Sequence, residues 1–332
     1  MFTILKTLMM TPSVSGREEN IRKVLQKHVA PLCDEVYTDA LGNLIAHKKG
    51  ADKDAKKVML CAHMDEIGFL VTFIEDDGFI RIAPVGGIHP SASAFCEVVS
   101  EKGVAGVVVP NDGTKPEDFK ISNFYIDIGA KNKKEAEKKV AIGDFFVCRP
   151  SLTRLMGKKV TGRPLDDRVG CAVLLKVAEY FATKAPKNDL YYVFSVQEEV
   201  GCRGAKTAAY GISADFGLVF DVTLTGDTPS AKPMACKLGG GAAIKIKDSS
   251  VICHKDVVDK LISVARDEKI AHQCEILTAG GTDTSSIQMT GCGAKVGALS
   301  IPTRYVHSGV ETCDLSDAEA CVSLSVKFIE SI

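Results

Sequence analysis

The 332 residues of this chain include no tryptophan, and aromatic residues make up only 6% of them. So few rings weaken a carbohydrate-binding interpretation, because sugars commonly stack on aromatic side chains. Net charge is also small, since 41 basic and 42 acidic residues leave a formal charge of -1. This balance argues against nucleic acid or an anionic membrane as the main partner. No apolar run approaches the roughly 18–20 residues that a membrane-spanning helix needs.

The twelve cysteines include no Cys-x-x-Cys unit, and the closest pair is Cys313 and Cys321. This spacing disfavours both a disulfide framework and a thiolate zinc site. Residues 1–10 are apolar, but they lack the basic segment and the small-residue cleavage site of a secretion signal. We therefore expect a cytoplasmic protein.

The chain contains segments with two different sequence patterns. Between residues 67 and 161, short apolar strands are separated by turn signals such as Asp76-Asp-Gly78, a pattern that predicts a small all-β unit of about 95 residues. Residues 1–66 and 162–332 instead alternate strands with helices, which predicts a mostly parallel sheet with helices on both faces. We therefore expect an α/β catalytic domain (1–66 plus 162–332) with an inserted barrel-like β domain (67–161).

Polar residues that can bind metals follow several of the predicted buried strands. They are His63 and Asp65 after strand 58–62, Glu198 and Glu199 after strand 190–196, Asp221 after strand 216–220, and His307 in the loop after strand 295–300. Asp166 and Asp167 open a predicted helix. The carboxyl ends of the strands of an open α/β sheet line one crevice, so these side chains should converge.

Two histidines and several carboxylates suit two divalent ions, with zinc or cobalt preferred and manganese allowed. Such ions lie roughly 3.5–4 Å apart and lower the pKa of bound water to about 7. One carboxylate outside the metal shell would then move protons, and Glu198 and Glu199 can divide these roles.

Simpler interpretations exist for each motif alone. The acids after strand 190–196 could face a helix macrodipole, and Asp166 and Asp167 could form a helix cap. The Gly239–Gly241 and Gly280–Gly281 runs lack a phosphate-binding context. The serines lack the Gly-x-Ser-x-Gly turn of a serine hydrolase.

Taken together, the motifs resemble those of the dinuclear metalloaminopeptidases of family M42, which include glutamyl, leucyl and deblocking aminopeptidases and the TET peptidases. The matching segments run from residue 11 to residue 308: Thr11-Pro-Ser-Val-Ser-Gly-Arg-Glu18, Ala62-His-Met-Asp-Glu-Ile-Gly68, Leu165-Asp-Asp-Arg-Val-Gly170, Val196-Gln-Glu-Glu-Val-Gly201, Phe220-Asp-Val222, Gly280-Gly-Thr-Asp283 and Ile301-Pro-Thr-Arg-Tyr-Val-His-Ser308.

The resemblance implies a role for each matching residue. The implied metal ligands are His63, Asp166, Glu199, Asp221 and His307, with Asp166 rather than Asp167 as the bridge. Glu198 would be the general base, and Asp65 would orient His63. Thr282, Asp283 and Arg304 match positions near the substrate.

The resemblance also implies activity and assembly. We expect removal of N-terminal residues from short peptides, and self-association through the inserted β domain into dimer-based dodecamers. Two other functions remain open, namely an endoglucanase-type glycoside hydrolase and a non-catalytic assembly protein stabilised by metal. The side-chain preference at the substrate N-terminus, the physiological metal and the oligomer size are not readable from the sequence.

Overall fold

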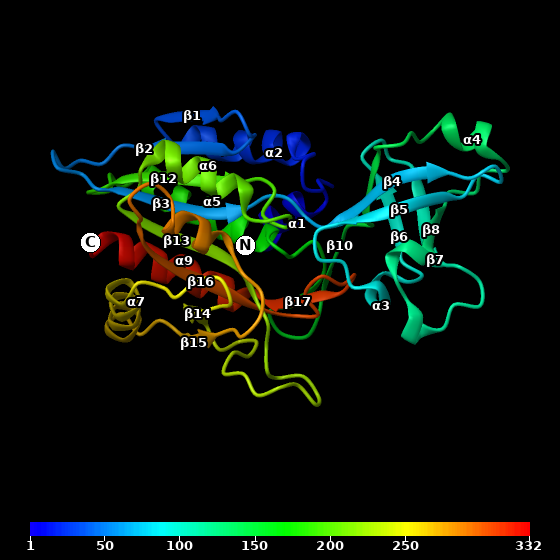
Figure 1. Cartoon of the computed structure of the whole chain (residues 1–332). Coiled ribbons are helices and arrows are strands. Elements are labelled where there is room, and N and C mark those ends of the chain that lie inside the picture. The colour runs from blue at the N-terminus through cyan, green and yellow to red at the C-terminus, as the bar shows by residue number, and fades with distance from the viewer.

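A computed structural model describes residues 1–332 and contains two units, an α/β body and a smaller β-barrel (Figure 1). Their apolar side chains form two separate buried clusters, of 62 residues in the body and 14 residues in the barrel. None of the helices has the length and apolar character needed to cross a membrane.

The body is built on a single eleven-stranded sheet whose path runs β1-β2-β12-β3-β13-β16-β17-β11-β10, with β14 and β15 branching from β16. Its strands are β1 (Glu35–Thr38), β2 (Leu44–Lys48), β3 (Lys57–His63), β10 (Ser151–Arg154), β11 (Lys159–Arg163), β12 (Asp189–Ser195), β13 (Phe216–Thr223), β14 (Ala242–Lys247), β15 (His272–Ile276), β16 (Lys295–Arg304) and β17 (Glu311–Asp314).

The predicted α/β class is confirmed, and the sheet is mixed. Parallel pairing links the four central strands β12, β3, β13 and β16, and also β14 with β15. The other pairs in this sheet are antiparallel. The central strands are almost continuously apolar, as expected for strands that are covered on both faces.

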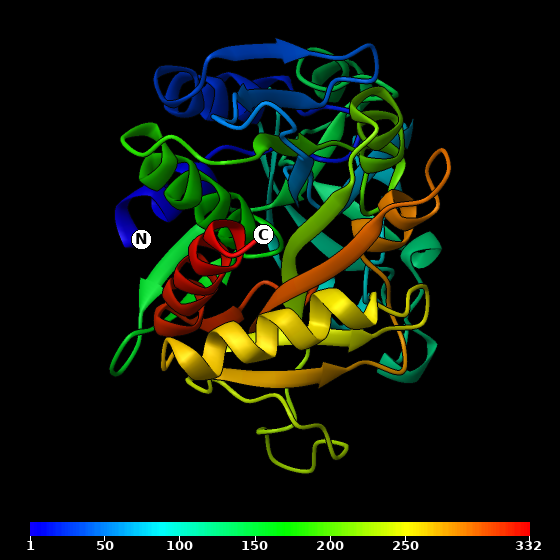
Figure 2. The ribbon, with the colours of Figure 1, turned by 90° about the vertical axis from the view of Figure 1, so that its left-hand side faces the viewer.

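Helices cover both faces of this sheet (Figure 2). Helices α5 (Arg168–Ala182) and α9 (Leu315–Glu330) pack on one face, and α6 (Arg203–Ile212) and α8 (Asp283–Gln288) pack on the other. The remaining helices of the body are α1 (Phe2–Met9), α2 (Glu19–Val29) and α7 (Lys255–Asp267).

The barrel is closed in the order β4-β5-β8-β7-β6-β9. Its elements are β4 (Gly68–Ile74), β5 (Ile80–Val85), α3 (Pro90–Ser93), β6 (Glu97–Ser100), β7 (Ala105–Pro110), β8 (Phe124–Asp127), α4 (Lys133–Glu137) and β9 (Phe145–Cys148). After β9 the chain returns to the body, where β11 pairs with β17. The domain boundary predicted at residue 161 remains an interpretation.

Candidate metal centre

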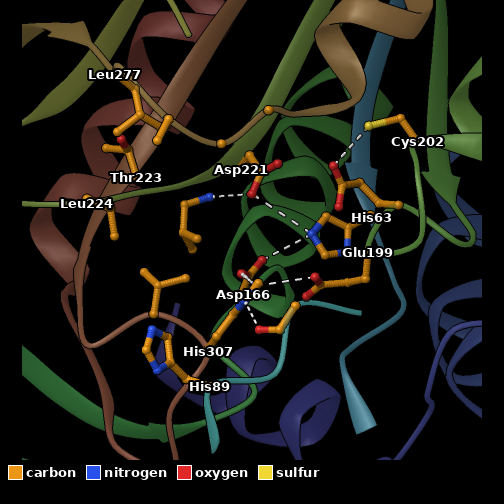
Figure 3. Close-up of a pocket in the computed structure, with 17 residues that line it drawn as sticks. His63, His89, Asp166, Glu199, Cys202, Asp221, Thr223, Leu224, Leu277 and His307 are labelled. Carbon is orange, nitrogen blue, oxygen red and sulfur yellow. Dashed lines mark hydrogen bonds and ion pairs between the residues drawn. The ribbon is translucent and has the colours of Figure 1, made fainter. Parts of the chain in front are cut away.

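A cleft of about 480 Å³ opens at the carboxyl ends of the central parallel strands (Figure 3). Its lining consists of His63, Gly87, His89, Asp166, Glu198, Glu199, Cys202, Asp221, Val222, Thr223, Leu224, Leu277, Ala279, Gly280, Gly281, Val306 and His307. All five metal ligands implied by the sequence resemblance are in this set, so the predicted convergence at the strand ends takes place.

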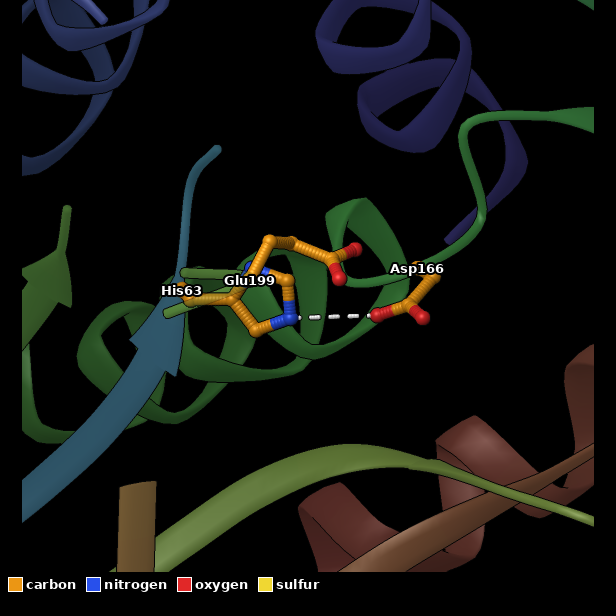
Figure 4. Close-up of side chains that lie close together, drawn as sticks. All are labelled: His63, Asp166 and Glu199. Carbon is orange, nitrogen blue, oxygen red and sulfur yellow. Dashed lines mark hydrogen bonds and ion pairs between the residues drawn. The ribbon is translucent and has the colours of Figure 1, made fainter. Parts of the chain in front are cut away.

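His63 ends β3, and its ring is almost fully buried. Its Nε2 lies 3.1 Å from Asp166 Oδ1 and 3.9 Å from Asp221 Oδ1. Figure 4 shows the His63 ring beside Glu199, with its Nε2 toward Asp166, and one ligand atom from each of these three residues lies within 4.8 Å of the others. Asp221 comes from β13, so two neighbouring parallel strands bring His63 and Asp221 together.

His307 approaches the same Asp166 carboxylate from the opposite side. Its Nε2 lies 3.2 Å from Asp166 Oδ2 and 3.2 Å from Glu199 Oε2. Each oxygen of Asp166 therefore faces a different histidine, which is the arrangement that a bridging carboxylate requires. Asp167 also lies within 4.8 Å of His63 and Asp221, but its Oδ1 accepts the Gly170 N–H and caps α5. Of the two aspartates, Asp166 is the one that contacts both histidines.

Asp65 is fully buried and contacts three residues of the cleft, namely His63, Glu198 and Glu199. Its Oδ1 lies 3.5 Å from His63 Nδ1 and accepts the Glu198 N–H at 3.0 Å. Its Oδ2 accepts the Ser15 hydroxyl at 2.6 Å and the Glu199 N–H at 3.3 Å. Burial opposes ionisation, but His63 and these donors hold the pKa of Asp65 below its usual value. His63 Nδ1 also lies 3.2 Å from the Asp65 carbonyl oxygen, so this one residue holds the His63 ring through its backbone and side chain and binds the backbone of both glutamates.

Glu198 points into the cleft but pairs with neither histidine. Its Oε1 accepts a hydrogen bond from the Cys202 thiol at 3.1 Å. Burial raises the pKa of Glu198 well above its ordinary value, and although His63 opposes this shift, the Asp221 carboxylate adds to it. A carboxyl group placed outside the ligand set in this way can accept and release a proton during a reaction.

The electrostatics of the centre favour a cation. Burial raises the pKa of Glu199, and the nearby Asp166 carboxylate raises it further. Burial disfavours the charged form of His307, but Asp166 and Glu199 outweigh this effect and raise its pKa to about 11. Glu199 Oε1 is buried without a hydrogen-bond partner. These crowded nitrogen and oxygen donors fit divalent ions of the zinc, cobalt and manganese type.

Two supporting contacts to His307 were not predicted from the sequence. Its Nδ1 lies 2.8 Å from the carbonyl oxygen of Gly87, which follows barrel strand β5. Its backbone N–H donates to Glu311 Oε1 at 2.9 Å. Glu311 Oε2 also accepts the N–H groups of Leu165 and Asp166, at 2.6 and 3.2 Å. The buried Glu311 side chain therefore holds the backbone on both sides of the Asp166–His307 contact.

The barrel also contributes His89 to the cleft lining. The Gly86-Gly-Ile-His-Pro90 segment shows no ligand spacing, so the sequence offered no signal for this placement. The structure thus shows that a loop of the barrel forms part of the wall of the cleft.

The three residues predicted near the substrate do not line the cleft. Thr282 caps α8, and Asp283 is buried, where it accepts the Ser195 hydroxyl at 2.5 Å. Arg304 is bound to Asp227 through its Nη2, 2.6 Å from Oδ2. A direct substrate contact for these residues remains a prediction.

Comparison with known proteins gives consistent matches over nearly the whole chain. The profile described as M42 glutamyl aminopeptidase matches residues 42–324. A putative aminopeptidase of Acetivibrio thermocellus is 47% identical, covering 99% of this chain and 98% of that protein.

Two solved structures also superpose on this chain over nearly its whole length. An aminopeptidase of the archaeon Desulfurococcus kamchatkensis superposes with a TM-score of 0.95 at 36% identity, covering 99% of this chain and 94% of the other. The TET1 peptidase of Pyrococcus horikoshii, which can assemble into a tetrahedron or a large octahedral shell, gives a TM-score of 0.91 at 33% identity, covering 100% and 99%.

Proposed function

This chain belongs to the M42 glutamyl aminopeptidase family and is a peptidase, and we propose that it removes N-terminal residues from short peptides with two divalent metal ions and Glu198 as general base. The observation that carries this proposal is the Asp166 carboxylate, which presents one oxygen to His63 and the other to His307.

Each ion would have its own ligands besides the shared Asp166. His63 and Asp221 would hold one ion, and Glu199 and His307 would hold the other. The contact of 3.2 Å between Glu199 Oε2 and His307 Nε2 supports placing these two residues on the same ion. Zinc and cobalt suit the donors best, and manganese is also compatible.

Bound ions would supply Lewis-acid polarisation of the peptide carbonyl and lower the pKa of a bound water to about 7. A residue of the chain itself would then transfer the protons. Glu198 would take the proton of the attacking water and deliver it to the amine that leaves, since its carboxyl group lines the cleft outside the ligand set. Asp65 would keep Glu198 in place through the backbone N–H that it binds.

We further propose that copies of this chain self-associate through the barrel, with dimers building a dodecamer. The likeness to the assembling TET1 peptidase supports this proposal. A cytoplasmic location is supported by the twelve cysteines, all of which are free thiols.

Removal and return of the metal test the proposed function. Protein dialysed against a strong chelator should lose the hydrolysis of aminoacyl anilides, and zinc or cobalt should restore it. The alternative glycoside hydrolase predicts cellulose hydrolysis that survives the chelator. The alternative non-catalytic assembly protein predicts bound metal without turnover of any anilide.

A further inference from the structure

The metal cleft has two chemically different sides. In Figure 3 the ligands His63, Asp166, Glu199 and Asp221 lie together, whereas Leu224 and Leu277 lie apart from them across the cleft. Val222, Ala279 and Val306 also line the cleft. Leu224 is 46% exposed, so a large apolar side chain is left open at the cleft.

No lysine or arginine lines this cleft. Three cations near the cleft are already engaged: Lys245 pairs with Glu275, Arg304 pairs with Asp227, and Arg163 pairs with Glu311. An acidic side chain of a substrate would therefore find no lysine or arginine in the cleft, and His89 is the one basic ring of the lining outside the metal ligands.

A basic side chain of a substrate also lacks an ion-pair partner in this cleft. The four carboxylates that line the cleft are Asp166, Glu198, Glu199 and Asp221, and all of them belong to the metal centre or to its proton transfer. An ammonium group placed against Leu224 and Leu277 would lose hydration without gaining an ion pair, which is costly.

We infer that the wall formed by Leu224 and Leu277 selects peptides whose N-terminal side chain is uncharged and apolar, such as leucine or methionine. This inference rests on the proposed aminopeptidase function and assigns its substrate class. His89, from the barrel, borders the same space, so the barrel helps to delimit the substrate pocket.

The effect of truncating Leu224 or Leu277 on substrate selectivity can be predicted in magnitude. One methylene of a substrate held in a hydrophobic pocket is worth about 10- to 200-fold in discrimination, and a truncated pocket loses part of that contact. Leu224→Ala and Leu277→Ala should each lower kcat/KM for a leucyl anilide about tenfold relative to an alanyl anilide. Leu155 is 45% exposed and lies in the turn between β10 and β11, away from the cleft, so Leu155→Ala is a matched control that should leave this ratio unchanged.

The experiment measures kcat/KM of the metal-loaded protein and the three variants on leucyl, methionyl, alanyl, glutamyl and lysyl anilides. Metal content of each variant is measured alongside, so that a loss of ions is not mistaken for a change in selectivity. The inference expects the leucyl or methionyl substrate to exceed the glutamyl and lysyl substrates by at least about tenfold.

Three results would overturn it in different ways. A glutamyl or lysyl substrate that is cleaved best refutes the apolar wall as the selecting feature. An unchanged leucyl-to-alanyl ratio in both cleft variants refutes the role of these two leucines. If the metal-loaded protein cleaves none of the five anilides, the proposed function itself fails, and the inference fails with it.

Discussion

Replacing Gly87 by alanine should weaken only one of the two expected metal sites. The carbonyl of Gly87 lies 2.8 Å from His307 Nδ1, so it fixes the ring with Nε2 facing Asp166 and Glu199. A Cβ atom on Gly87 would lie 3.1 Å from both Cε1 and Nδ1 of that ring. Residue 87 does not have a positive φ, so alanine adds this close contact without backbone strain.

The ring would have to move by a few tenths of an ångström. Changes to groups that orient a metal ligand typically lower metal affinity 10- to 100-fold, which corresponds to about 1.4–2.7 kcal/mol. We expect that loss for the ion held by His307 and Glu199. The ion held by His63 and Asp221 should keep its affinity, because neither residue contacts the Gly87 segment.

Competition with a chromophoric zinc chelator, which resolves two binding steps, measures both affinities. Gly309→Ala is the matched control, because it changes the same loop as His307 but meets nothing within 4 Å and has no positive φ. If Gly87→Ala binds both ions as tightly as the control does, the barrel carbonyl does not position His307.

Three further changes test the groups that support the centre. Asp65→Asn should lower the affinity of the His63 ion about 10- to 100-fold, as measured by the same chelator competition. Glu311→Gln places an amide N–H₂ against backbone donors that now bind a carboxylate; it should cost about 1–3 kcal/mol of unfolding free energy in urea. Arg168→Met leaves the buried Glu66 carboxylate, 3.3 Å away, without its cation, and should cost about 3–5 kcal/mol in the same assay. Unchanged metal affinity of Asp65→Asn would refute the role of Asp65. An unchanged urea unfolding curve of Glu311→Gln or Arg168→Met would refute the role of that residue.

The convergence of the strand-end residues could be predicted because it depends on local rules, whereas their assignment as ligands came from the resemblance and stays a prediction. His63 and Asp221 follow apolar strands, and parallel neighbours deliver their carboxyl ends to one edge of the sheet. The choice between Asp166 and Asp167 had to come from the resemblance, since both residues open the same helix. The structure separates them by what each side chain contacts: Asp167 caps α5, and Asp166 lies between two histidines.

The supporting residues were missed because they act over long sequence distances. Gly87 contacts His307 through a backbone carbonyl, which no side-chain pattern records. Glu311 is a strand residue whose carboxylate binds backbone N–H groups near residues 165 and 307. The antiparallel parts of the sheet were also not predicted, because the direction of β17 depends on pairing with β11 and β16 rather than on its own composition.

The most direct test of the central claim compares Glu198→Gln and Glu199→Gln in one titration of metal-free protein with zinc, following bound metal and anilide turnover together. We expect Glu198→Gln to bind two ions per chain and to remain inactive, because it keeps the ligands and loses the base. We expect Glu199→Gln to bind the second ion more weakly. Normal turnover by Glu198→Gln with both ions bound would contradict the account.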